Sequence, residues 1–177
     1  MSNLKFDLSK ITEESALNTI AINSNSNIFS YKLSFRFFVY EHSRTIRNII
    51  RALLKDSLSK ININKINLII DELINNVIEY SNNELNIIKI NINLKKDNTI
   101  IIKIRVLDSW NKDKIKAKDI LSKEKYLNSN SNNNKNIYKL RWRWLFCIVK
   151  KISNNFKIKD NKKWWISVIS KIKIFSI

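Results

Sequence analysis

The sequence predicts an α/β domain in which two amphipathic helices pack together on a β-sheet. Residues 44–58 and 64–80 repeat apolar side chains at intervals of three and four, the spacing that gives a helix one buried face. Residues 85–94 and 99–107 alternate apolar and polar side chains and are separated by KKDN, which is typical of two strands joined by a turn. The length of 177 residues fits one such domain.

The other predicted elements complete the sheet and the helix layer. The aromatic and β-branched string YKLSFRFFVY at residues 31–40 predicts a strand before the first helix. Residues 145–152 predict a third helix, and residues 156–159 and 166–174 predict two closing strands.

Two segments lack this clear periodicity. Residues 1–30 end in the polar run NSNSN, so we expect a loosely attached, peripheral extension with one short helix at about 12–22. The domain then spans residues 31–177. Residues 109–140 lose the pattern and contain an asparagine-rich tract, and loops this long in compact domains are usually functional lids or disordered.

Composition excludes several classes of function. A single cysteine excludes a disulfide framework, a cysteine cluster for zinc and a redox pair. No apolar run approaches the roughly 18 to 20 residues of a membrane span. The N-terminus MSNLKFDLSK is charged where a signal peptide has an apolar stretch. We therefore expect a cytoplasmic protein with no membrane partner.

The net charge of +18 suits a partner that carries phosphate. The lysines are scattered along the chain, however, and Ile, Asn and Lys make up about half of all residues, which indicates an AT-rich genome that raises lysine content everywhere. Nucleic-acid binding is therefore retained only as an alternative function.

Three short motifs could carry chemistry. Glu72 and Asn76 are four residues apart in the second predicted helix, so they project from one face near the border of the buried stripe. A carboxylate and a carboxamide so placed can orient water and complete the oxygen shell of Mg²⁺. Asp108 follows an apolar strand, and residues 142–145 open the third helix, where free main-chain N–H groups can bind phosphate.

In order and spacing, these motifs resemble the nucleotide-binding boxes of the GHKL (histidine-kinase-like) ATPase superfamily. The resemblance is strongest to its anti-sigma-factor serine-kinase branch, the RsbW-like proteins, and covers residues 31–175. Glu72 and Asn76 match the first box, E-x-x-x-N-A-x-x-H-A, with Tyr80 in the histidine position. The second box, D-x-G, is matched by Asp108, with Trp110 in the glycine position.

The third box, G-R-G-L-F, is matched by Arg143 and Leu145, with Trp142 and Trp144 where the family has glycine. The final Gly-Gly turn of the family corresponds to the tryptophan pair at 164–165. The chain contains no glycine, and all five of its tryptophans stand at glycine positions of the family.

A shared cause explains the five tryptophans. UGA is read as tryptophan in some bacterial codes and as glycine in others, so we hypothesise that the natural protein carries glycine at these positions. The alternative is a degenerate site in which bulky indoles fill the nucleotide pocket. The five codons, or the intact mass of the natively expressed protein, decide between the two.

The resemblance implies the GHKL (Bergerat) ATPase fold. This fold is a two-layer sandwich with a mixed, mostly antiparallel sheet and three main helices on one face. It implies ATP and Mg²⁺ as cofactors, with Glu72 as the catalytic base, Asn76 as the magnesium ligand and Asp108 as the acceptor for the adenine amine. Residues 142–145 would hold phosphates, and residues 109–140 would form the ATP lid.

The function implied by the resemblance is an ATP-dependent protein-serine kinase that acts as an anti-sigma factor. Such a protein binds a sigma factor, phosphorylates a STAS-type anti-anti-sigma partner and forms a homodimer. Phosphoryl transfer depends on positioning and charge neutralisation, which these residue types supply. The alternatives are a non-catalytic binding module with a degenerate pocket and a basic nucleic-acid-binding protein.

Two single residues have simpler interpretations. His42 in EHSRT is similar to a phosphoacceptor motif, but the 30 positions to Glu72 leave no room for the two dimerisation helices of a histidine kinase. We therefore expect His42 to lie at a helix start. Cys147 stands among apolar residues and is expected in the core.

Overall fold

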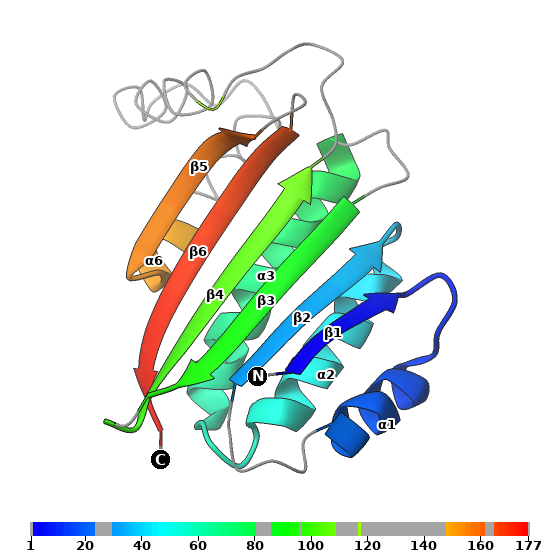
Figure 1. Cartoon of the computed structure of the whole chain (residues 1–177). Helices are drawn as coiled ribbons and strands as arrows, with labels where there is room; N and C mark the ends of the chain where they lie inside the picture. The colour runs from blue at the N-terminus through cyan, green and yellow to red at the C-terminus, as the bar shows by residue number, and fades with distance from the viewer. Residues whose placement is uncertain are drawn as a thin grey trace.

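The computed structural model describes residues 2–23, 30–80, 86–95, 97–108, 117, 148–161 and 165–176. Within them, six strands form one sheet in the order β1-β2-β3-β4-β6-β5 (Figure 1). The strands are β1 (Ser2–Asp7), β2 (Ser30–Phe37), β3 (Asn86–Leu94), β4 (Thr99–Asp108), β5 (Asn155–Asn161) and β6 (Trp165–Phe175). Only β1 and β2 pair in parallel, and the other neighbours pair antiparallel.

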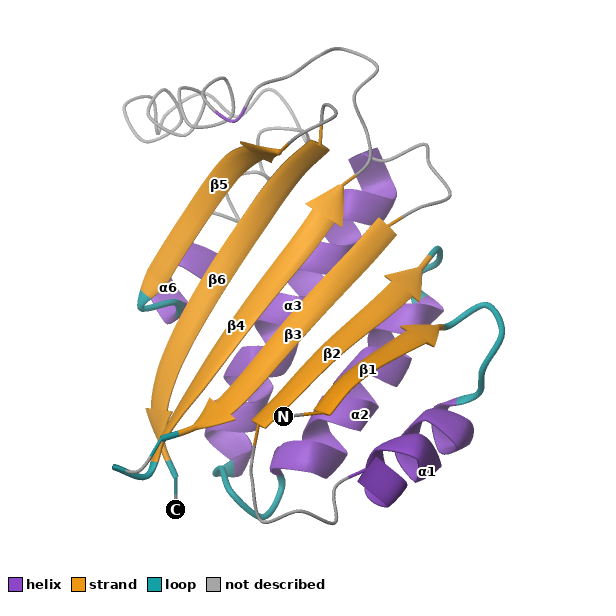
Figure 2. Ribbon diagram, viewed as in Figure 1, coloured by secondary structure: helices purple, strands orange, loops and turns teal. Residues whose placement is uncertain are grey.

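The helices of the described chain lie against one face of this sheet (Figure 2). They are α1 (Glu13–Asn23), α2 (Glu41–Leu54), α3 (Lys60–Tyr80) and the short α6 (Lys150–Ile152). This arrangement confirms the predicted two-layer α/β sandwich with a mixed, mostly antiparallel sheet. None of the described helices is long and apolar enough to cross a membrane.

The core lies between α3 and the central strands. The apolar stripe of α3, which includes Ile66, Ile70 and Ile74, is fully buried against strand residues such as Ile90 and Ile104. Burying one such side chain contributes about 1.5 to 3 kcal/mol. Because this stripe faces the sheet, the polar residues of α3 lie on the other sides of the helix, and the candidate site lies among them.

The predicted helix boundaries differ from the observed ones at two points. The first long helix ends at Leu54 rather than near residue 58, and the second begins at Lys60 rather than near residue 64. Ser59 sets the earlier start, because its Oγ accepts a hydrogen bond from the Asn62 N–H at 3.4 Å, as an N-cap does. The alternating string ININ masks the helical period there.

The N-terminal segment is not loosely attached, which corrects that expectation. Strand β1 forms the edge of the sheet, and Phe6 stacks on Phe35 of β2 with ring centroids 5.2 Å apart. Ala16 and Ile20 of α1 are buried in the same core, and α1 confirms the predicted short helix. The alternation Leu4, Phe6, Leu8 is too short to stand out in the sequence, and its partner strand begins more than 20 residues later.

The predicted β3–β4 turn is confirmed and is made without glycine. The Lys95 N–H donates to the Thr99 carbonyl at 2.8 Å, and Asp97 Oδ1 accepts from the Thr99 N–H at 3.1 Å. Asn98 has φ of 55°, and among the described residues it alone has positive φ. Asparagine tolerates this left-handed conformation better than other residues with a Cβ.

Candidate functional site

Glu72 and Asn76 lie on α3 at the border of its buried stripe. Both residues are half-buried, whereas their neighbours Leu73 and Val77 are in the core. The packing of the stripe against the sheet therefore places a carboxylate and a carboxamide one helical turn apart at the edge of the helix layer. This placement is the one expected from the sequence.

The Asn76 side chain is held in a defined orientation. Its Nδ2 donates a hydrogen bond to the main-chain carbonyl of Glu72 at 2.5 Å. A carbonyl oxygen can only accept, so the amide nitrogen must face it and Oδ1 must point the other way. That Oδ1 is buried and has no hydrogen-bond partner among the described residues. A buried acceptor without a donor is costly, which marks it as an atom that can take a ligand.

A clamp between α2 and α3 holds the residue before Glu72. The Arg47 guanidinium lies 2.9 Å from Asp71 Oδ2, and the Ser43 hydroxyl donates to Asp71 Oδ1. Ser43 and Arg47 are one turn apart on α2, so both reach the same carboxylate. We call these three residues the Asp71 clamp. It resists rotation of α3 about its axis and so supports the direction in which Glu72 and Asn76 project.

The sequence motifs did not identify Asp71 as part of the candidate site, although the spacing of nearby residues could have indicated it. Ser43 and Arg47 are spaced by four on a predicted helix, and Asp71 precedes the candidate glutamate. Only the packing of α2 on α3 shows that these positions meet.

The main chain of Asp108 ends β4, where it pairs with Ile166 of β6. The C-terminal ends of α3 and β4 lie at the same end of the sheet (Figure 1). The fold thus brings the backbone of the first two motifs to one end of the molecule.

The remaining predicted site positions are not described at the level of side chains. Tyr80 and Asp108 are described only through their main chain, and the other predicted residues lie outside the described part of the chain: Trp110, Trp142, Arg143, Trp144 and Leu145. Cys147 and the predicted lid, apart from Ala117, also lie outside it. The Ala117 N–H donates to Asp160 Oδ1 of β5 at 2.7 Å.

His42 lies in the first turn of α2, as expected. Its Nδ1 accepts a hydrogen bond from the Phe38 N–H at 3.1 Å, and burial lowers the pKa of the imidazole. Nδ1 can accept this bond only in the neutral ring, so both observations favour a neutral histidine that joins β2 to α2.

Within the described residues, no group of three or more His, Cys, Asp or Glu side chains could enclose a metal ion. The described residues by themselves would therefore leave most of the oxygen ligands of a divalent cation at Asn76 to other groups, such as water or a bound phosphate. Mg²⁺ characteristically binds in this way.

Comparison with known proteins gives little further guidance. No protein-family model and no curated protein matches the sequence. Among solved structures, this chain is similar to a chain in the crystal structure of the SiaB-SiaC complex from Pseudomonas aeruginosa, with 15% identity and a TM-score of 0.49 over 89% of this chain and 97% of that chain. A likeness this distant supports no statement about function.

Proposed function

We propose that this protein binds ATP with Mg²⁺ in the manner of the GHKL ATPases and acts as a protein-serine kinase that regulates transcription by partner switching. The proposal is carried by one observation, the buried Asn76 Oδ1 one turn from Glu72, for which the described part of the chain offers no hydrogen-bond donor. The resemblance of the sequence motifs supplies the nucleotide and the partners, a sigma factor and a STAS-type anti-anti-sigma protein. It also implies a homodimer.

The residues that are present fit a magnesium ion. Asn76 Oδ1 is an oxygen acceptor, and oxygen is the ligand atom that this cation prefers; the orientation of the amide already presents it. Bound Mg²⁺ would neutralise charge on the phosphate groups.

The chain's own residues would supply positioning and proton transfer. Glu72 would accept the proton of the attacking serine hydroxyl, and Asp108 would accept a hydrogen bond from the adenine amine. The Asp71 clamp would keep Glu72 directed at the reaction, since a general base must lie within hydrogen-bond reach of the proton it removes.

Calorimetry tests nucleotide binding. The protein for this test carries glycine at all five tryptophan positions, as the codon hypothesis requires. We expect heat on adding ATP with Mg²⁺, and we expect Asn76→Ala to weaken this binding by about tenfold or more, the loss of roughly 1.4 kcal/mol. Asn64→Ala, an exposed change on the same helix, is the matched control and should leave affinity unchanged. No heat with the glycine-restored protein would end the proposal.

A second measurement separates a kinase from a non-catalytic binding module. Glu72→Gln keeps the shape of the side chain but removes the base, so a kinase should retain ATP binding and lose phosphate transfer to a STAS-type protein by a factor of about 10² or more. Glu41→Gln, an exposed change on α2, should transfer normally. Equal transfer by the two variants would contradict the assigned role of Glu72.

A further inference from the structure

The face of the sheet opposite the helices carries a concentration of positive charge. In each strand, alternate residues pack toward the helices and the others lie on the open face. In β3, for example, Ile88 and Ile90 are buried and Lys89 between them is exposed. Every strand places at least one exposed lysine on this open face, namely Lys5, Lys32, Lys89, Lys103, Lys157 and Lys171.

Four further Lys or Arg residues share the open face, which makes ten cations there against one described carboxylate, Asp7. The three long helices α1, α2 and α3 carry five Lys or Arg and six Asp or Glu. An AT-rich genome would raise lysine content in all elements alike. It therefore does not explain why the cations gather on one face, and the lysines that look scattered in the sequence are brought together by strand pairing.

The cations on the open face also oppose one another. Lys89 pairs directly with Arg105, and Lys103 with Lys171, and like charges placed opposite each other across a sheet are destabilising. Arg105 donates to the Ser167 hydroxyl at 2.9 Å, and because a hydroxyl is neutral this bond does not compensate the charge of the guanidinium. An anionic partner would relieve this repulsion.

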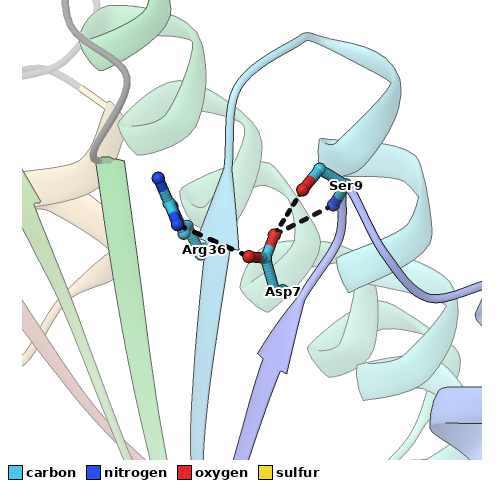
Figure 3. A network of polar contacts seen from close by, with 3 residues as sticks. All are labelled: Asp7, Ser9 and Arg36. Atoms are coloured by element: carbon cyan, nitrogen blue, oxygen red, sulfur yellow. Dashed lines mark hydrogen bonds and ion pairs between the residues drawn. The ribbon is translucent and has the colours of Figure 1, made fainter.

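Asp7 cannot neutralise the face. It lies 3.5 Å from Arg36 and accepts hydrogen bonds from the Ser9 main chain and hydroxyl at 3.2 and 2.7 Å (Figure 3). The bond from the Ser9 hydroxyl is the largest cause that holds the pKa of this carboxyl below its usual value. Desolvation opposes it, and the main-chain bond and the nearby cations lower the pKa further. The carboxylate is therefore already engaged at the β1 edge, away from the central cations.

We propose that the open face of the sheet binds the acidic surface of a partner protein. The cations are interspersed with half-buried apolar residues, Ile87, Ile101 and Ile169, which only a partner with apolar side chains of its own would cover. A single-stranded nucleic acid would need aromatic rings to stack on. Within the described strands of this face, such a ring occurs only at Phe175, at the far end of β6, and the ring of Phe38, just after β2, is already covered by the Arg36 guanidinium 4.9 Å from its centre. A second copy of this chain is disfavoured as the partner, because its open face would place ten more cations against these ten.

The test uses two triple variants with the same change in net charge. The first reverses the open face with Lys89→Glu, Lys103→Glu and Lys171→Glu, and the second reverses exposed lysines elsewhere with Lys55→Glu, Lys60→Glu and Lys65→Glu. All six side chains are exposed, so both variants should fold. The probes are a fluorescent random copolymer of glutamate and tyrosine, poly-glutamate and poly-uridylate, titrated at about 0.15 M salt.

We expect the unaltered protein to bind the glutamate–tyrosine copolymer more tightly than poly-glutamate or poly-uridylate. The open-face triple should lose about tenfold or more in affinity, because each exposed ion pair contributes about 0.2 to 1 kcal/mol and reversal also adds repulsion. The second triple should change affinity less than about twofold.

Three results would overturn the inference. Equal losses in the two triples would mean that overall charge, not this face, attracts the probe. Tighter binding of poly-uridylate than of the copolymer would make nucleic acid the ligand. If the unaltered protein associates with itself and only the open-face triple abolishes this association, the face is a contact between copies. None of these measurements involves ATP, so the inference stands or falls separately from the proposed nucleotide site.

Discussion

Removing the carboxylate of Asp71 should destabilise the protein and loosen the candidate site together. Asp71→Ala removes the ion pair with Arg47 and the hydrogen bond from Ser43. It leaves a cation whose buried Nε already has no hydrogen-bond acceptor within the part of the chain that the structure describes. The ion pair is partly open to water, with the Arg47 and Asp71 side chains 34% and 23% exposed, so screening reduces its contribution.

The expected loss is about 2 kcal/mol. A hydrogen bond to a charged group contributes about 1.5 to 3 kcal/mol when fully buried, and an exposed ion pair contributes about 0.2 to 1 kcal/mol. Urea denaturation followed by circular dichroism measures the loss in the free energy of unfolding. Asp56→Ala, an exposed carboxylate after α2, is the matched control and should change stability by less than about 0.5 kcal/mol.

A double-mutant cycle shows whether the clamp is the cause. Ser43→Ala and Asp71→Ala should be non-additive by about 1 kcal/mol, because each removes the same hydrogen bond. Strictly additive effects, or an Asp71→Ala variant as stable as Asp56→Ala, would refute the reasoning. If the clamp also orients α3, Asp71→Ala should weaken binding of ATP with Mg²⁺ in the glycine-restored protein, although no direct contact is removed.

Two further predictions concern contacts near the C-terminal end of β2. Burial lowers the pKa of His42 below its ordinary value of 6.5, so the unfolded chain binds a proton more readily than the folded one. The resulting stability is fully present above pH 6.5 and is lost as the pH falls through 6.5 toward the pKa of the folded protein. When the pH is lowered from about 8 to about 5, the urea midpoint of the unaltered protein should therefore fall more than that of His42→Gln. In the neighbouring strand β1, Phe6→Ala should cost about 3 kcal/mol, because it removes a ring stacked on Phe35. A Phe6→Ala protein with an unchanged midpoint would mean that β1 contributes nothing to the fold.

Most of the correct predictions about the fold came from the periodic spacing of apolar residues in the sequence. The spacing of Ile66, Ile70 and Ile74 is a local property of the chain, and so is the alternation in β3 and β4, because both depend only on backbone geometry. The same local geometry placed Glu72 and Asn76 on one helix face before any packing was known. The N-terminal strand was missed because its alternation is short and its partner is remote.

The sequence by itself determined the class and order of the described elements other than β1, and the position of an acid and an amide one turn apart at the border of a buried stripe. Only the tertiary structure decided that Asp71 is clamped by α2, that Asn76 Oδ1 is buried with no hydrogen-bond donor among the described residues, and that lysines from six strands share one open face. The physical reason is that helical and strand periods arise between near neighbours in the chain. Contacts such as that between Lys89 and Arg105 depend instead on which strands pair, and pairing is chosen by the burial of the opposite face.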